Sequence, residues 1–300
     1  MPKIHANNLH IEYEFFGDPA HPTVLLVMGL GMQLVGWPDD FCQDLANSGY
    51  RVLRFDNRDI GLSSHLDHLG KPNLIWGLLK RRIGLPIRAP YSLADMAQDA
   101  VALLDALQIE QAHVVGASMG GMIAQLVAGI APQKVLTLTS IMSSSGAPGL
   151  PGPTPRAQAA LLKRPPKSAY HPAQRDRLVE HYLNNSRVIR SPAFPMSEDA
   201  RRARIRRGLD RSIHPEGVLR QLLAIAQGPD RSPILQQIRQ PTLVIHGKQD
   251  PLVPIDCGRD TARKIPGARL LEIDGMGHDL PPGVCQLLVD ALVPHFRSVR

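Results

Sequence analysis

GASMGG, residues 116–121, is the stretch of sequence that decides the fold. The run before it, AHVV at 112–115, is short and apolar and predicts a buried strand, while MIAQLVAGI at 122–130 predicts a helix. A strand that passes directly into a helix needs a sharp turn, which places Ser118 in a strained backbone conformation that small flanking glycines relieve. The pattern G-x-S-x-G in this context is typical of a nucleophile elbow. The alternative is a tight strand–helix turn in an α/β protein without catalysis.

Strands and helices alternate on both sides of this turn. Continuous apolar runs, typical of strands buried on both faces, lie at 23–28, 50–55, 135–140, 241–246 and 269–273. Helices are predicted at 38–48, 92–107 and 284–296, the second with Ser92 as N-cap and Asp95 as its acidic partner. Residues 9–16 alternate and predict an edge strand. The alternation predicts an α/β fold with a mostly parallel sheet and helices on both faces.

The alternation stops between residues 143 and 231. This stretch begins with SSSGAPGLPGPTP, which is rich in proline and glycine, and continues with helical patterns and no buried strand. We therefore predict a mainly helical cap at 143–231, inserted into a core formed by 1–142 and 232–300. Such a cap would lie over the carboxyl ends of the strands, where open α/β sheets bind ligands. The irregular region 71–91, with a short helical patch at Lys80, Arg81 and Arg82, is expected to flank the same cleft.

A serine hydroxyl attacks a carbonyl efficiently only when a base removes its proton. His278, in GMGHD at 275–279, follows the last predicted strand and is the candidate base. Asp250, in HGKQDPLVP at 246–254, also follows a buried strand and is the candidate acid that orients the histidine. The chain order Ser, Asp, His is that of hydrolases with a nucleophile elbow, and unrelated triads run in different orders. The three residues are predicted to form a catalytic triad.

Acyl transfer also requires two backbone N–H groups that bind the negative charge on the carbonyl oxygen. We expect one from Met119, directly after the nucleophile, and the other from Leu30, in the loop after the strand at 23–28. Gly29 and Gly31 would let this backbone approach the substrate closely, so we expect them to bind it. A loop that serves packing alone is the alternative.

Other chemically suggestive residues are predicted to be structural. In DNRDIGLS at 56–63, Asp56 and Arg58 are expected to pair with each other and to hold the nearby loops. His246 and His113 are expected to make structural hydrogen bonds. His65 and His68 have no metal-ligand companion in the sequence, which also lacks zinc and nucleotide-binding motifs, so we expect no metal and no cofactor. The cysteines are predicted to be buried thiols, and they are Cys42, Cys257 and Cys285.

The formal charge is +7, from 34 Lys and Arg and 27 Asp and Glu, and an arginine-rich run lies at 201–211. Such a run could bind nucleic acid or an acidic membrane surface. A solvated helix face is the preferred interpretation. No aromatic residues interleave with the arginines, which argues against binding of single-stranded nucleic acid by base stacking. The longest apolar run, 23–33, is too short to span a bilayer, and the N-terminus lacks a signal-peptide core. We expect a cytoplasmic monomer or homodimer with no nucleic-acid partner and no stable membrane insertion.

The chain resembles the α/β-hydrolase superfamily over residues 9–142 and 240–298. Within it, VMGLGMQLVGWPDDF, RFDNRDIGLS and HVVGASMGG look like the aclacinomycin methylesterase group and related bacterial esterases. The resemblance implies an α/β-hydrolase fold, the triad and the two N–H donors already named, a small-molecule ester substrate and no cofactor. Many members have His before the glycine at position 29, where this chain has Met28. Hydrogen bonds within this loop, and substrate preference, are therefore expected to differ.

The function expected is hydrolysis of a carboxylic ester through an acyl-enzyme. Thioesterases, lactonases and carbon–carbon bond hydrolases use the same triad and remain alternatives. A non-enzymatic ligand receptor on the same scaffold is an alternative from a different class.

Overall fold

One sheet of eight strands forms the centre of the computed structural model, which describes residues 2–72, 76, 85 and 88–299. The strands are β1 (Lys3–Ala6), β2 (Leu9–Phe16), β3 (Thr23–Val27), β4 (Arg51–Phe55), β5 (Ala112–Ala117), β6 (Val135–Ile141), β7 (Thr242–Gly247) and β8 (Arg269–Ile273). Their order is β1-β2-β4-β3-β5-β6-β7-β8. The pairs β1–β2 and β2–β4 are antiparallel and the other neighbours are parallel. The predicted mostly parallel sheet is confirmed.

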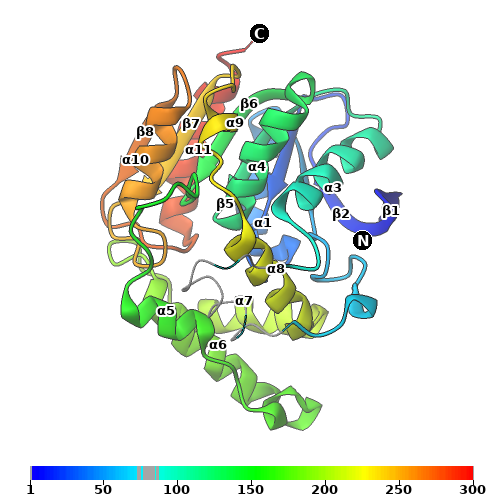
Figure 1. The fold of residues 1–300 in the computed structure, drawn as a ribbon, viewed down its shortest axis with the longest axis vertical. Helices are drawn as coiled ribbons and strands as arrows, with labels where there is room; N and C mark the ends of the chain where they lie inside the picture. The colour runs from blue at the N-terminus through cyan, green and yellow to red at the C-terminus, as the bar shows by residue number, and fades with distance from the viewer. Residues whose placement is uncertain (1, 73–75, 77–84, 86–87, 300) are drawn as a thin grey trace.

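Helices cover both faces of this sheet (Figure 1). On one face lie α3 (Leu93–Ala106), α4 (Met119–Ile130) and α10 (Ile255–Lys264), and on the other lie α1 (Asp39–Asn47) and α11 (Pro282–Phe296). Every residue of β3 and β5 is buried, as expected for parallel strands covered on both sides. Helix α3 begins with the predicted capping box, in which Ser92 and Asp95 each bind the other's backbone N–H.

The prediction that residues 9–16 form an edge strand is wrong. β2 lies second in the sheet, because the chain before it forms β1 and pairs with it from Ala6 opposite Leu9. The two residues between these strands, Asn7 and Asn8, have φ of 49° and 62°. A two-residue hairpin turn requires left-handed backbone of this kind, and asparagine tolerates it better than most residues.

The segment between β6 and β7 contains helices and loops and crosses the end of the sheet at which the parallel strands finish (Figure 1). Its helices are α5 (Pro155–Leu162), α6 (Arg175–Ile189), α7 (Glu198–Arg211), α8 (Pro215–Gln227) and the short α9 (Ser232–Leu235). Helices α6 and α7 share a small apolar cluster that includes Leu178, Val179 and Leu209. We refer to residues 143–231 as the cap; its limits as a separate domain remain a prediction.

Short 3-10 helices complete the connections. They span Leu34–Gly36, Asp67–Leu69, Pro132–Lys134, Lys167–Tyr170 and Pro172–Gln174. The patch Lys80 to Arg82 lies outside the described residues.

The three cysteines are buried free thiols, as predicted. Among the helices that the structure describes, none combines the length and the apolar character needed to cross a membrane.

Gly120 is the glycine on which the packing of α4 against β3 depends. A Cβ at this position would overlap the carbonyl oxygen of Val27. We expect Gly120→Ala to lower the free energy of unfolding by about 1–3 kcal/mol, because backbone on both sides must move apart. Gly152→Ala is the matched control, since nothing lies within 4 Å of its added Cβ. Urea unfolding of both variants measures the difference; equal stabilities would refute the packing argument.

Candidate active site

Ser118 occupies the turn between β5 and α4, and its backbone adopts φ 56° and ψ −121°. L-residues rarely adopt this conformation, so the strain predicted from the sequence is confirmed. Gly116 cannot carry a Cβ, which would overlap the carbonyl oxygen of Gly120. The turn is held by β6, because the Ser118 N–H donates to the carbonyl of Ile141 at 2.9 Å. The strand, the helix and the neighbouring strand together fix the position of the serine.

Ser118, His278 and Asp250 lie within hydrogen-bond distance of one another in series. The His278 Nε2 atom is 2.9 Å from Ser118 Oγ, and its Nδ1 atom is 2.6 Å from Asp250 Oδ2. His278 and Asp250 are both buried. Because a carboxylate only accepts hydrogen bonds, Nδ1 carries the proton, and Nε2 is left as the acceptor for the serine hydroxyl. The three side chains follow the ends of β5, β7 and β8. In the sheet, β7 and β8 are neighbours, and β6 lies between β5 and β7.

The segment after β7 holds the Asp250 carboxylate in place. Its Oδ1 atom accepts the N–H groups of Leu252 and Val253, both at 2.8 Å. His246 closes the same turn through a hydrogen bond of 2.7 Å between its Nε2 atom and the carbonyl of Val253, which is the structural role predicted for it. Burial lowers the pKa of His246, which favours the uncharged imidazole. The free Oδ2 atom of Asp250 is thereby directed to His278.

The cap holds the segment that carries His278. The His278 N–H donates to the carbonyl of Ile189 at 2.7 Å, at the end of α6. The neighbouring Asp279 carboxylate accepts the Ser191 N–H at 2.8 Å and the Ser191 hydroxyl at 2.6 Å. Arg201 of α7 approaches the same carboxylate at 3.1 Å. The orientation of the histidine therefore depends on contacts that cross from the cap to the core.

The loop after β3 passes directly over Ser118. A Cβ on Gly29 would lie 3.2 Å from Ser118 Cβ and 3.7 Å from its Oγ, so a side chain here would obstruct the serine. The Gly29 carbonyl accepts the Met32 N–H at 3.2 Å, which closes a turn over 29–32. Gly31 has φ +68°, and a Cβ at this position would lie 3.2 Å from the Val218 side chain of the cap. Met119 begins α4, where backbone N–H groups have no partner within the helix.

Asp56 and Arg58 do not pair with each other, and the prediction that they do is wrong. Arg58 binds the Asp99 carboxylate through two nitrogens at 2.5 and 2.6 Å. Asp56 accepts the Leu34 N–H at 2.7 Å and meets Arg211 of α7 at 2.5 Å. Burial raises the pKa of the Asp56 carboxyl, and the Arg211 charge opposes this shift. The two side chains have different partners. Arg58 joins the segment after β4 to α3, and Asp56 joins the core to the cap.

The arginine-rich run of α7 is only partly the solvated helix face that the sequence favours: Arg206 and Arg207 are exposed, whereas Arg201 is buried. Five of the arginines form ion pairs with carboxylates of other elements: Arg201 with Asp279, Arg202 with Glu180, Arg206 with Asp176, Arg207 with Asp39 and Arg211 with Asp56. Arg204 donates to the carbonyl of Leu280 at 2.7 Å. Helix α7 lies between α6 and the core, so its charged side chains reach carboxylates on both sides.

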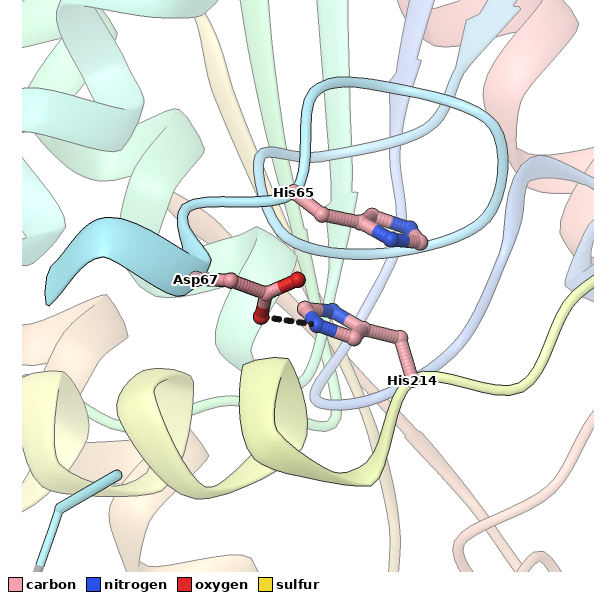
Figure 2. A group of neighbouring side chains, drawn as sticks. All are labelled: His65, Asp67 and His214. Carbon is pink, nitrogen blue, oxygen red and sulfur yellow. Dashed lines mark hydrogen bonds and ion pairs between the residues drawn. The ribbon is translucent and has the colours of Figure 1, made fainter. Parts of the chain in front are cut away.

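His65 does have companions, which the sequence does not indicate. Asp67 and His214 lie beside it, and the ligand atoms of the three residues are within 4.8 Å of one another (Figure 2). The rings of His65 and His214 stack at 3.8 Å with an interplanar angle of 3°. His214 is the N-cap of α8, whereas the other two belong to the segment after β4. The expectation that His65 has no companion is therefore wrong.

The hydrogen bonds of this His–Asp–His cluster indicate that it is a structural contact between the cap and the core. His214 Nδ1 is 2.7 Å from the Asp59 carbonyl, and its Nε2 is 2.8 Å from Asp67 Oδ1. Arg220 also binds Asp67, at 3.3 Å. A ring nitrogen binds a metal in the plane of its ring, and two parallel stacked rings do not direct their lone pairs to one point. These bonds occupy both ring nitrogens of His214 and join α8 to the core.

Comparisons with known proteins agree with this architecture. A family model described as alpha/beta hydrolase fold matches residues 22–281. The chain is 33% identical to rhodomycin D methylesterase DauP of Streptomyces sp. (strain C5) and 30% identical to rhodomycin D methylesterase DnrP of Streptomyces peucetius. Each alignment covers 95% of this chain and 94% of the relative. The resemblance inferred from the sequence motifs is confirmed.

A solved structure gives the same result for the fold. The meta-cleavage product hydrolase from Pseudomonas fluorescens IP01 superposes with a TM-score of 0.76 at 19% identity, over 100% of this chain and 98% of that one. At this identity the likeness concerns the fold, and it confirms the fold that the sequence motifs imply.

Arg211 and Arg207 on the same helix provide a test of the contact between cap and core. The Arg211 side chain is 11% exposed against a fully buried Asp56, whereas Arg207 and its partner Asp39 are each 46% exposed. We expect Arg211→Met to lower the free energy of unfolding by about 3–5 kcal/mol, because it leaves a buried carboxylate without its cation. Arg207→Met should cost about 1 kcal/mol or less. Chemical denaturation measures both; similar losses would contradict the assigned burial.

Proposed function

Since the chain belongs to the alpha/beta hydrolase fold family, we propose that it is a carboxylic ester hydrolase in which Ser118 is the nucleophile, His278 the general base and Asp250 the acid that orients the histidine. The observation that carries the proposal is the series of two hydrogen bonds, 2.6 Å from Asp250 to His278 and 2.9 Å from His278 to Ser118. The strained backbone of Ser118 supports it, because this conformation exposes the hydroxyl above the end of the sheet.

The proposed reaction has two halves. His278 Nε2 takes the Ser118 proton as Oγ attacks the ester carbonyl, and the protonated imidazole then gives this proton to the leaving alcohol. Water attacks the acyl-enzyme in the second half, with His278 as base again, and releases the acid and free Ser118. The buried carboxylate of Asp250 stabilises the imidazolium in both halves. The N–H groups of Leu30 and Met119 are the proposed oxyanion donors, and Gly29 and Gly31 the proposed substrate contacts.

Methyl esters of small-molecule acids are the substrates that we propose first. The two relatives at 33% and 30% identity are both named as methylesterases and align along almost their whole length. The alternatives on the same triad, namely thioester, lactone and carbon–carbon bond hydrolysis, differ in the leaving group rather than in the nucleophile. A receptor without catalysis has less support, because it needs no hydrogen-bonded serine, histidine and aspartate.

We also propose that the protein is a cytoplasmic monomer or homodimer that binds no nucleic acid. The basic run of α7 supports the last point, since five of its arginines face carboxylates: Asp279, Glu180, Asp176, Asp39 and Asp56. Arginines neutralised in this way contribute little to a surface that would attract phosphates.

Substitution of the triad tests the mechanism. Ser118→Ala should abolish turnover of a p-nitrophenyl ester, and Asp250→Asn should lower kcat on the order of 10⁴-fold, because the amide stabilises the wrong histidine tautomer. Asp256→Asn is a control on the exposed first turn of α10. Circular dichroism verifies that each variant is folded. Undiminished activity in the alanine variant, or less than a tenfold loss in the asparagine variant, would reject the assigned roles.

A substrate panel tests the bond that is cleaved. We expect kcat/KM to be highest for methyl esters when a methyl ester, a thioester and a lactone of matched acyl size are compared in the wild-type protein and in Ser118→Ala. All three activities should disappear in the variant. A thioester or lactone that outperforms the ester would replace the proposed substrate class while leaving the nucleophile unchanged.

A further inference from the structure

Gln221 of α8 is a fully buried polar residue that reaches from the cap into the loop over Ser118. Its Oε1 atom accepts the Gly31 N–H at 2.9 Å, and its Nε2 atom donates to the Arg58 carbonyl, also at 2.9 Å. We propose that Gln221 is a positioning residue for the oxyanion hole: by fixing the Leu30–Gly31 peptide, it holds in place one end of the adjoining peptide group, which carries the Leu30 N–H. This inference rests on the proposed esterase mechanism.

The argument begins with the planarity of peptide groups. The Leu30 N–H belongs to the same rigid plane as the Gly29 carbonyl, which accepts the Met32 N–H. The planes on either side of it are both anchored by side chains. Asn57 donates to the Met28 carbonyl at 2.9 Å, and Gln221 binds the Gly31 N–H. The peptide group that carries the proposed oxyanion donor is thus bracketed by two side-chain hydrogen bonds.

Gln221 binds the peptide group of this turn that is most able to rotate. In a four-residue turn, types I and II differ by a rotation of the central peptide, and type II requires positive φ at the third residue. Gly31 is that third residue, and its φ of +68° fits type II. Rotation of the Leu30–Gly31 peptide would replace the N–H that faces Gln221 with a carbonyl oxygen. Two oxygens would then face each other, so the glutamine opposes the rotation.

A glutamine amide meets this requirement because one side chain supplies both an acceptor and a donor. An ionised glutamate would accept from Gly31 but would also face the Arg58 carbonyl with a second acceptor. A methionine has similar length and neither function of comparable strength. Arg58 follows Asn57 in the chain, so the segment after β4 fixes the turn at both ends, once directly and once through Gln221.

Helix α8 holds Gln221 rigidly against the core. Gly217 packs so closely that a Cβ there would overlap the Asp59 carbonyl oxygen. Arg220 is buried and binds both oxygens of the Asp59 carboxylate, at 2.7 and 2.9 Å. Burial opposes ionisation of Asp59, but hydrogen bonds from Arg220 and the Leu66 N–H outweigh it and lower the pKa of this carboxyl. This part of the cap is therefore a fixed component of the site.

Paired oxygen and sulfur substrates distinguish a positioning role from a general structural one. We would measure kcat and KM for a p-nitrophenyl ester and for the thionoester in which sulfur replaces the carbonyl oxygen. Sulfur accepts hydrogen bonds weakly, so the ratio of the two rates reports on the oxyanion donors. For Gln221→Met we expect kcat on the oxygen ester to fall about 10- to 100-fold with little change in KM, part of the loss seen on removing a donor outright. The thionoester rate should fall less, which lowers the ratio.

The control is Gln227→Met on the same helix, whose side chain is exposed and binds the Ala89 N–H away from the loop. It should keep both the rates and the ratio of the wild-type protein. Gln221→Asn retains the amide but is one methylene shorter, so it decides the question if the methionine variant is not recovered folded. An unchanged ratio in a folded Gln221 variant, with or without equal losses on both substrates, would overturn the inference.

Ser118→Ala, measured in parallel, separates this inference from the proposed function. Full ester turnover in that variant would refute the serine mechanism. Loss of turnover in Ser118→Ala together with an unchanged oxygen-to-sulfur ratio in Gln221→Met would refute only the role of Gln221.

Discussion

The close approach of β3, β5 and α4 is the constraint on which the rest of the structure depends. Gly116 and Gly120 have no space for a Cβ, because backbone carbonyl oxygens occupy it. This contact forces the chain at Ser118 into a left-handed conformation that is unfavourable for any residue with a side chain. The strain persists because buried strands and the helix hold both ends of the turn. A reactive position is thus produced by backbone packing before any partner of the serine is considered.

The cap completes the site through polar contacts. The loop of His278 is fixed by the Ile189 carbonyl and by Ser191, and the loop over Ser118 is fixed by Gln221. Helix α7 adds ion pairs whose burial ranges from the enclosed Arg211–Asp56 pair to exposed pairs at its outer side. Since each buried polar group needs a partner, displacement of α7 or α8 would leave several core groups unsatisfied. These helices belong to the architecture of the site.

The segment after β4 connects the core with the cap. Asp56 accepts a hydrogen bond from the Leu34 N–H and forms an ion pair with Arg211, and Asn57 donates to the carbonyl of Met28. Asp59 binds Arg220, and the stacked His65 and His214 rings lie at the outer edge of the same contact. None of these side chains reaches Ser118, yet together they determine where the loop after β3 and helix α8 lie. A charged turn beside an active site can therefore act entirely through positioning.

The sequence by itself determined the elements and the order of the chemical groups. Apolar periodicity and turn residues depend on neighbours along the chain, so the strand and helix around Ser118, the capping box at Ser92 and the order Ser118, Asp250, His278 were readable in advance. Only the tertiary structure decided which distant side chains meet. Arg58 binds Asp99 rather than Asp56, and Gln221 reaches Gly31, because the direction of a side chain and the docking of α7 and α8 leave no periodic signal in the sequence.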